Sequence, residues 1–549
     1  MSNETPPVRR LPRPEVWAEA RRRETGRDPD RDAAVNGLIR VFWERGALAT
    51  LAAAAQRHPD KSYLLDGDRS VSYAAFLRLV MDQAATLRAA AAPAGPVAFL
   101  ARQTTCAAAA VFACVAVGRP CVALDPDGPM ARNLALLRTA RAAVLALAEG
   151  EDESASLSAA LVPGGATVWL PAPHSADNVM PNLGDAIPAT TDVDAPAFIF
   201  ATSGSTGSPK LIVHSQRTAS YLATLYSAAV LTDDRLLCVS GAPGSYSATL
   251  YLLTTAQRGA SLHLADLRSE GFRRFLDRLV AERMTVLRAG ASLFRTLAML
   301  PEARAAMTTL RSIRLAGEPT AQDDVRVLRP LVPADCLLVN TYAATECMSF
   351  SCLARADDDH DATRVPAGYV ELGGEAAVLD EYGALCEPGE VGELAVRSRY
   401  NALGEWVDGR LVQGRLVPDP LAAGMRVYFT GDQARASKDG CIVVLGRMDR
   451  MLKINGQRVE PMEMEVAIRE LADVHDVIVL PRVAGAVTSL AAFVVPGPRG
   501  RETVAAALRE RLRRHLPIHM LPARIVTMDA LPRLANGKVD GVALLAGLD

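Results

Sequence analysis

Phe198-Ile-Phe-Ala-Thr-Ser-Gly-Ser-Thr-Gly-Ser-Pro-Lys210 is the sharpest local signal in the sequence, an apolar run that passes directly into a loop of small residues. Gly204 and Gly207 allow tight turns, so that successive backbone N–H groups can converge on an anion. The side chains that add hydroxyl donors or a positive charge are Thr202, Ser203, Ser205, Thr206 and Lys210. The segment predicts a strand followed by a phosphate-binding loop.

This loop does not fit the Walker pattern G-x-x-x-x-G-K-[ST]. No glycine precedes Lys210, and Leu211 follows it. A kinase or ATPase of the P-loop class is therefore disfavoured.

The loop resembles the nucleotide loop of the adenylate-forming (ANL) superfamily, which includes acyl-CoA synthetases, nonribosomal peptide synthetase adenylation domains and luciferases. Other stretches similar to that family's motifs occur in the family's order. They are Val71–Phe76, Gly118–Pro126, Ala316-Gly-Glu-Pro319, Asn340-Thr-Tyr-Ala-Ala-Thr-Glu346, Gly389–Leu394, Tyr428-Phe-Thr-Gly-Asp432, Gly446–Glu460 and Leu531–Lys538. The chain is identified on these motifs as a stand-alone member of the superfamily.

The alternation of helical and β-rich segments predicts an α/β fold of layered, largely parallel sheets. Strand and turn residues crowd together between Ala376 and Val444, which predicts a β-rich subdomain. We expect a polar N-terminal extension at residues 1–36, solvated or loosely docked, and a large adenylation domain at 37–447. The resemblance adds a small, mobile α+β lid at 448–549.

The bulk composition narrows the class of protein. A formal net charge of -2 over 549 residues gives no sign of nucleic-acid or anionic-membrane binding. The nine cysteines are scattered, which favours a reducing compartment. The N-terminus is polar, and the longest apolar run, near Ala107–Val117, is too short to span a bilayer. We therefore expect a cytoplasmic protein that binds neither nucleic acid nor membrane.

The resemblance implies ATP and Mg²⁺ as cofactors. Glu346 matches the glutamate that helps bind Mg²⁺, and Thr345 matches the threonine that contacts the α-phosphate. Lys210 serves the β- and γ-phosphates, and Lys538 is the predicted catalytic cation of the lid. The remaining predicted nucleotide contacts are Gly317, Glu318, Pro319, Asn340, Tyr342, Asp432 and Arg447. Among these, Tyr342 matches the aromatic that stacks on adenine, and Asp432 can accept both ribose hydroxyls.

The resemblance also implies a second conformation for thiol transfer. Asp449 lies at the family's hinge position, and rotation would bring Lys453 and Gly456 to the active site. Eleven residues follow Lys538 in the sequence. We therefore expect the acceptor in trans, either the phosphopantetheine of a separate carrier protein or CoA.

The predicted acyl pocket disfavours an α-amino acid substrate. Amino-acid-activating relatives carry an aspartate for the α-ammonium group where this chain has Tyr246. The other pocket positions are Ser247, Leu250, Arg288, Arg314, Ala316, Thr341, Ser349 and Phe350. Each arginine either turns outward, pairs with a local acid, or points inward. An inward arginine favours a small polar acid, such as a keto, hydroxy or dicarboxylic acid.

Two other classes of function stay open on the sequence. The adenylate could be attacked by a non-thiol nucleophile, as in an amine ligase or in nitrite-dependent N–N bond formation. Alternatively, the chain could be a non-catalytic nucleotide-binding homologue. Retention of Lys210, Glu346, Asp432 and Lys538 together disfavours that last possibility.

Overall fold

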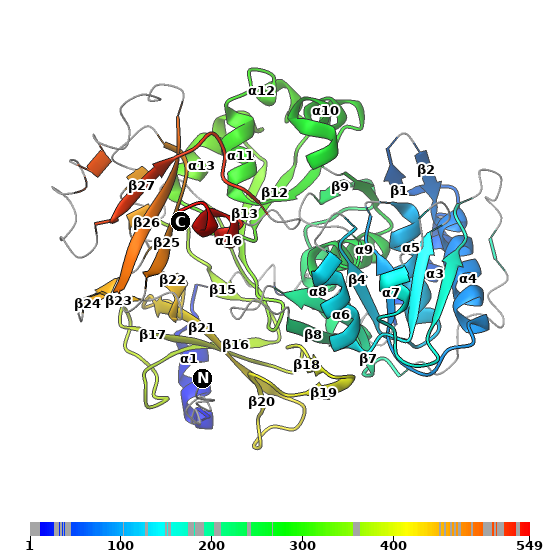
Figure 1. Ribbon diagram of the computed structural model, residues 1–549. Coiled ribbons are helices and arrows are strands. Elements are labelled where there is room, and N and C mark those ends of the chain that lie inside the picture. The colour runs from blue at the N-terminus through cyan, green and yellow to red at the C-terminus, as the bar shows by residue number, and fades with distance from the viewer. Residues whose placement is uncertain are drawn as a thin grey trace.

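Figure 1 shows the computed structural model of the chain. The structure describes residues 11–26, 32, 36, 38, 46–67, 69–102, 104–126, 130–148, 151, 155–173, 180–181, 192–202, 210–238, 243–265, 267–354, 363–448, 452–454, 457–459, 461, 464–465, 468–469, 474–484, 487–497, 508–509, 512, 521–533 and 539–548.

A nine-stranded sheet forms one wall of the large N-terminal domain. Its central strands run parallel, and antiparallel strands lie at both edges. In spatial order the strands are β15 (Tyr369–Val370), β14 (Phe350–Leu353), β13 (Leu337–Tyr342), β12 (Ser312–Ala316), β11 (Val286–Ala289), β9 (Arg235–Cys238), β10 (Ser261–Leu264), β1 (Ser62–Asp66) and β2 (Arg69–Ser72).

An eight-stranded sheet forms the second wall. In order its strands are β19 (Arg410–Val412), β18 (Gly404–Val407), β8 (Lys210–Ser215), β7 (Pro196–Thr202), β4 (Cys121–Leu124), β3 (Val97–Leu100), β5 (Val144–Ala148) and β6 (Ala166–Leu170). The β18–β19 hairpin comes from the segment predicted as a β-rich subdomain, but it joins this sheet by pairing Gly404 with Val213. Pairing partners so far apart in sequence are chosen by the tertiary fold, not by local pattern.

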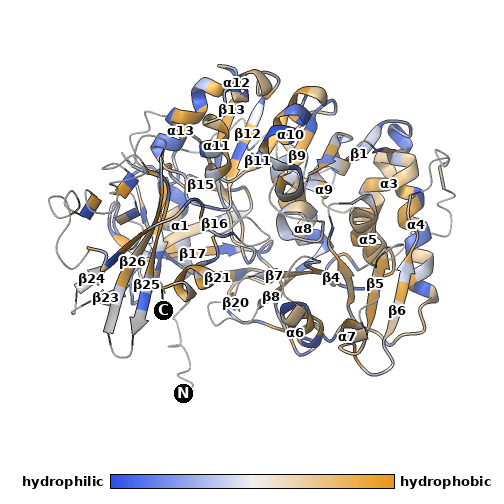
Figure 2. Cartoon of the chain, turned by 45° about the horizontal axis from the view of Figure 1, so that its top comes forward, coloured by the Kyte–Doolittle hydropathy of each residue, from blue (hydrophilic) through white to orange (hydrophobic). Residues whose placement is uncertain are grey.

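Apolar helices fill the space between the two sheets (Figure 2). All twelve residues of α5 are buried, and half of them are alanine, whose small side chain allows close packing on both faces. The helices of this middle layer are α3 (Ala47–Arg57), α4 (Tyr73–Ala89), α5 (Thr105–Ala116), α8 (Gln216–Ser227) and α9 (Tyr246–Arg258). The predicted α/β layers are confirmed.

Further helices cover the outer faces of the two sheets. The nine-stranded sheet carries α10 (Leu267–Ala281), α11 (Ala291–Ala298), α12 (Ala303–Ala306) and α13 (Gln322–Leu328), and the 3₁₀ helix η1 (Arg329–Leu331) follows α13. The eight-stranded sheet carries α6 (Met130–Ala140) and α7 (Ala155–Ser158). No helix in the described part of the chain has the length and apolarity needed to cross a membrane.

The N-terminal helix α1 (Pro14–Arg23) packs against a separate five-stranded sheet (Figure 1). Trp17 is only 1% exposed there, and Arg21 forms an ion pair with Glu375. The strands of this sheet are β16 (Gly374–Leu379), β17 (Val391–Ser398), β21 (Arg426–Ala436), β20 (Leu416–Pro418) and β22 (Ile442–Arg447). The composition predicted a solvated or loosely docked extension, whereas this part of it is a helix anchored by a buried tryptophan. Trp17 and Ala20 are buried in this core, and Leu11 and Val16 pack against it, which is enough apolar burial to dock an otherwise charged helix.

The C-terminal part of the chain has its own cores on both faces of a three-stranded sheet. A two-stranded ladder precedes the three-stranded sheet in the sequence, and a short helix packs on one face of the three-stranded sheet. The elements are β23 (Leu452–Ile454), β24 (Gln457–Val459), β25 (Val474–Ala484), β26 (Val487–Pro496), β27 (Arg524–Thr527) and α16 (Gly541–Ala546). The fold is therefore a large α/β domain followed by a smaller α+β domain.

Candidate active site

The β7–β8 hairpin presents the two ends of the phosphate loop. These antiparallel strands pair Thr202 with Lys210 at the last step of their ladder. Backbone pairing therefore brings the first hydroxyl and the lysine of the loop side by side. The other predicted loop residues, Ser203, Gly204, Ser205, Thr206 and Gly207, lie outside the described residues.

The segment that carries Thr345 and Glu346 joins β13 to β14 and is held from two directions. His214 of β8 donates from Nε2 to the Thr345 carbonyl at 2.7 Å, because that oxygen can only accept. Ala402 N–H donates to the Glu346 carbonyl at 2.9 Å. Burial lowers the pKa of His214 to about 4, so the ring is neutral at pH 7. A neutral imidazole thus clamps the segment without adding charge beside a phosphate site.

The Glu346 side chain is half-buried, and its desolvation raises the pKa of the carboxyl group. The positive charges of Lys210 and Arg447 act in the opposite direction, which indicates that both cations lie near it. No group of three or more His, Cys, Asp or Glu side chains suited to a metal occurs in the described regions. The single carboxylate of Glu346 still fits Mg²⁺, because this ion is commonly held by one or two carboxylates together with substrate phosphates.

Tyr342 and Asp432 come from different sheets and meet through their side chains. The Tyr342 hydroxyl donates a hydrogen bond to the Asp432 carboxylate. The β21–β22 ladder pairs Asp432 with Arg447, whose Nη1 lies 3.3 Å from Asp432 Oδ1. Burial and the adjacent Asp432 both raise the pKa of Tyr342 well above its usual range. The predicted adenine and ribose contacts therefore form one cluster.

Asn340 and Glu318 already have protein partners. Asn340 is buried, accepts from Thr320 at 2.9 Å and donates to the Pro366 carbonyl at 2.8 Å. Glu318 follows Gly317, whose φ of 95° favours glycine, and accepts from Ser292 N–H at 2.5 Å at the start of α11. Asn340 keeps a second lone pair on its amide oxygen, while Glu318 is committed to capping α11. The neighbouring Pro319 extends this turn after β12.

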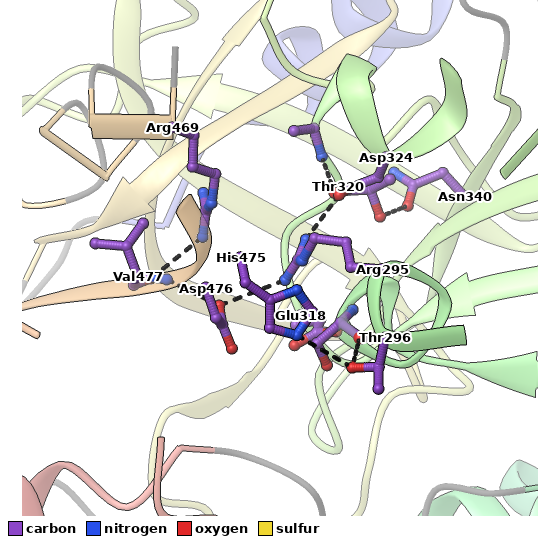
Figure 3. A network of polar contacts seen from close by, with 12 residues as sticks. Arg295, Thr296, Glu318, Thr320, Asp324, Asn340, Arg469, His475, Asp476 and Val477 are labelled. Atoms are coloured by element: carbon purple, nitrogen blue, oxygen red, sulfur yellow. Dashed lines mark hydrogen bonds and ion pairs between the residues drawn. The ribbon is translucent and has the colours of Figure 1, made fainter. Parts of the chain in front are cut away.

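A polar network that includes Asn340 and Glu318 joins the two domains (Figure 3). Arg295 of α11 forms ion pairs with Asp324 at 2.7 Å and with Asp476 of β25 at 3.7 Å. Asp476 also binds Arg533 at 2.6 Å, and Arg533 lies 3.9 Å from Glu318. His475, the neighbour of Asp476, lies 3.4 Å from the Thr296 hydroxyl.

Arg533 precedes Lys538 and Val539 follows it, and the two form an isolated β-bridge. Because Arg533 belongs to the network, the chain on both sides of Lys538 lies at the network. Lys538 itself, Asp449 and Gly456 lie outside the described residues. Of Lys453 only the backbone, in β23, is described. The structure therefore locates the surroundings of Lys538 and not its ammonium group.

The predicted acyl-pocket residues lie between the nine-stranded sheet and α9. Tyr246 and Ser247 begin α9, and the ring of Tyr246 is 5.6 Å from His214 and 5.4 Å from Phe200 between centroids. The fully or nearly fully buried members of the set are Leu250, Arg288, Arg314, Ala316, Thr341, Ser349 and Phe350. Burial excludes the outward-turned alternative for both arginines.

Several residues that shape this site were missed by sequence reasoning: His214, Tyr226, Tyr251, Arg295, Asp476 and Arg533. His214 could have been found, because it is the only histidine within the apolar strand β8. The others carry no local signal, because their role depends on contacts between elements distant in sequence.

Comparison with known proteins agrees with this arrangement. The family model described as AMP-binding enzyme matches residues 51–406, and that described as AMP-binding enzyme C-terminal domain matches residues 463–538. Phosphinothricin tripeptide synthetase PhsC of Streptomyces viridochromogenes is 30% identical over 90% of this chain, which spans 44% of that synthetase.

Solved structures share the fold over nearly the whole chain. NpsA of Klebsiella oxytoca in complex with 3-hydroxyanthranilyl-AMSN superposes with a TM-score of 0.74 at 22% identity, covering 92% of this chain and 99% of NpsA. The anthranilate CoA ligase AuaEII in complex with anthranoyl-AMP gives 0.73 at 19% identity, covering 92% and 97%.

Proposed function

This chain belongs to the AMP-binding enzyme family, and we propose that it uses ATP to convert a carboxylic acid into its acyl-AMP, releasing pyrophosphate, and then passes the acyl group to a thiol. One convergence supports the proposal. Lys210 begins β8, whose His214 holds the segment of Thr345 and Glu346, and the Asp432–Arg447 pair supplies a further carboxylate and cation from another part of the sequence. Together they offer a cation for phosphates, a carboxylate for Mg²⁺ and a carboxylate for ribose.

Each group has a distinct task in adenylate formation. Lys210 and the phosphate loop hold the β- and γ-phosphates, and Thr345 contacts the α-phosphate from the segment that His214 clamps. Glu346 holds Mg²⁺, which reduces the repulsion between the attacking carboxylate and the triphosphate. The Tyr342 ring stacks on adenine, and Asp432 accepts the ribose hydroxyls. These fixed charges need little rearrangement during the reaction.

Lys538 supplies the remaining cation, which bridges the substrate carboxylate and the phosphate as charge builds on the bond-forming oxygen. The neighbouring Val539 is bridged to Arg533, and Arg533 lies 3.9 Å from Glu318 of the large domain. This position suits a lid docked for adenylation. Rotation about Asp449 then withdraws Lys538 and brings Lys453 and Gly456 to the site for thiol transfer.

The acceptor is a thiol in trans, with carrier-bound phosphopantetheine favoured over CoA. The resemblance of Gly118–Pro126 and Leu531–Lys538 to peptide synthetase adenylation domains supports the carrier, and a curated relative is named a tripeptide synthetase, whereas a structural neighbour is named a CoA ligase. The pocket lacks a carboxylate at Tyr246, so the substrate is not an α-amino acid.

Pyrophosphate exchange and product mass test the two half-reactions separately. A broad panel of carboxylic acids is expected to give exchange with wild-type protein. Lys538→Ala is expected to lower exchange by about 10²–10³-fold, whereas the exposed Lys438→Ala leaves it unchanged.

Adding CoA or a phosphopantetheinylated carrier to the adenylation mixture then identifies the acceptor by the mass of the thioester. Release of product at the same rate without any thiol would contradict thiol transfer and support attack by an amine or by nitrite. If none of the acids in the panel gives pyrophosphate exchange, the enzymatic proposal is contradicted.

A further inference from the structure

Arg288 and Arg314 stand side by side on one face of the nine-stranded sheet. The parallel strands β11 and β12 pair them in register. Register partners in a parallel ladder send their side chains to the same face. Here that face is covered by α8 and α9, since the Arg314 guanidinium lies 4.6 Å from the Tyr226 ring centre and the Arg288 guanidinium 5.8 Å from that of Tyr251.

Both arginines are hidden from solvent, with exposures of 5% and 6%. Arginine remains charged at all accessible pH values, and burying a charge is costly unless a partner compensates it. Arg314 has only neutral partners among the described residues, the Thr341 hydroxyl at 2.9 Å and the Tyr226 ring. A ring and a hydroxyl compensate a buried guanidinium only in part.

Two partly buried arginines of the same chain are matched by carboxylates. Arg397 lies between Glu375 at 2.6 Å and Asp419 at 2.7 Å. Arg295 has Asp324 and Asp476. No ion pair of Arg314 with an acidic side chain occurs in the described part of the chain. Arg314 therefore keeps a buried positive charge that a ligand carboxylate can compensate.

Unpartnered hydroxyls accompany the arginines. Tyr246 Oη and Ser349 Oγ are both buried without a hydrogen-bond partner in the described regions. The charge of Arg288 acts on the Tyr246 hydroxyl, which places the two near each other. The Tyr246 ring also contacts His214, the residue that clamps Thr345. Tyr246 therefore lies between the arginine pair and the site of adenylation.

We propose that Arg288 and Arg314 bind a second carboxylate of the substrate, so that the enzyme activates one end of a short dicarboxylic acid. The inference rests on the proposed function and names its substrate class. One carboxylate attacks the α-phosphate, the bond to pyrophosphate breaks, and the mono-adenylate forms. The other carboxylate stays ionised between two planar guanidinium groups, whose geometry matches carboxylate oxygens. Tyr246 and Ser349 donate further hydrogen bonds to the substrate.

A wild-type panel tests the inference without any variant. Pyrophosphate exchange is measured with C3–C6 dicarboxylic acids and with the monoamide of each, which has the same shape and lacks the second charge. The best diacid is expected to exceed its monoamide at least 100-fold in kcat/KM, which corresponds to about 2.7 kcal/mol. Equal values, or higher values for the monoamide or for a keto or hydroxy monoacid, would overturn the inference while leaving adenylation intact.

Variants then assign the selectivity to the pair. Arg314→Met and Arg288→Met are expected to reduce the diacid-to-monoamide ratio at least tenfold. The matched control Arg273→Met, at a position 86% exposed, should keep the ratio. If Arg314→Met does not fold, Arg314→Lys is used instead. Lysine keeps the positive charge and lacks the paired N–H donors of a guanidinium group, so a reduced diacid-to-monoamide ratio is again expected. An unchanged ratio in a folded variant would refute the role of the pair.

Binding without catalysis separates failure of the inference from failure of the proposed function. The best diacid should raise the Tm of wild-type protein in the absence of ATP, and this shift should vanish in Arg314→Met and persist in Arg273→Met. A shift without exchange would keep the diacid site and overturn adenylation. Exchange with monoacids, together with no Tm shift from any diacid, would keep adenylation and overturn the diacid site.

Discussion

The hydroxyl of Tyr342 donates a hydrogen bond to the carboxylate of Asp432, a residue 90 positions further along the chain. The contact joins β13 of the nine-stranded sheet to β21 of the five-stranded sheet. Asp432 also faces Arg447 across the β21–β22 ladder. The proposed adenine and ribose contacts are therefore aligned before a nucleotide arrives, which lowers the ordering cost of binding.

Replacing Asp432 by asparagine should weaken ATP binding specifically. Hydrogen bonds to a charged acceptor contribute about 1.5–3 kcal/mol, so the KM for ATP is expected to rise about 10–100-fold. Tyr369 and Asp439 form a similar phenol–carboxylate pair at 2.5 Å elsewhere, which makes Asp439→Asn the matched control. Exchange kinetics measured against ATP concentration check the prediction, and equal KM values for the two variants would contradict it.

Replacing Glu346 by glutamine should raise the Mg²⁺ requirement. The change keeps the shape of the half-buried side chain and removes its negative charge, so half-maximal exchange is expected at about tenfold higher Mg²⁺ concentration or more. The exposed Glu390→Gln serves as control. Titration of exchange activity with Mg²⁺ provides the measurement. An identical titration curve for Glu346→Gln would argue that another group holds the ion.

Replacing Asp476 by asparagine should loosen the docked lid. Asp476 links Arg533 of the lid, at 2.6 Å, with Arg295 of the large domain. Loss of a partly buried charge pair costs about 1–3 kcal/mol, so adenylation is expected to slow about tenfold. Transfer from pre-formed acyl-AMP to thiol, for which we propose a rotated lid, should not slow.

The exposed pair of Asp323 with Arg326 offers a control for this lid variant. Asp323→Asn removes a surface ion pair, which contributes little. Single-turnover measurements of each half-reaction distinguish the two variants. Equal slowing of both half-reactions by Asp476→Asn would point to general damage instead of a docking role.

Replacing Trp17 by alanine should destabilise the large domain without changing the chemistry. Trp17 is 1% exposed against the five-stranded sheet, and emptying such a site costs about 3–5 kcal/mol. Trp169 is 50% exposed, so Trp169→Ala should alter the free energy of unfolding by less than about 0.5 kcal/mol. Urea unfolding checks the difference. A Trp17→Ala variant as stable as wild type would mean that α1 adds nothing to the fold.

Local sequence was sufficient wherever the signal and the structure occupy one short segment. Among the short β-rich segments whose alternation with helices predicts an α/β fold, Val97–Leu100, Cys121–Leu124 and Ser261–Leu264 form β3, β4 and β10. The apolar run near Ala107–Val117 coincides with α5, buried throughout. Strand pattern and side-chain apolarity are properties of neighbouring residues, so no distant partner was needed to recognise them.

Contacts between distant segments were beyond the reach of the sequence. The pattern named Arg288 and Arg314 as pocket residues, yet it left open whether they faced solvent, a local acid or the pocket. Only the register of β11 and β12 and the cover of α8 and α9 showed that both are buried and not turned to solvent. The docking of α1 through Trp17 and the joining of β18 to β8 were hidden for the same reason.

The motifs by themselves determined the family, the α/β class and the chemical types gathered for ATP, because each motif carries its own backbone turn and charge. The tertiary structure decided which charges are neutralised within the protein and which are left for a ligand. That distinction depends on burial and on partners far apart in sequence, since the energy of a charge is set by everything packed around it.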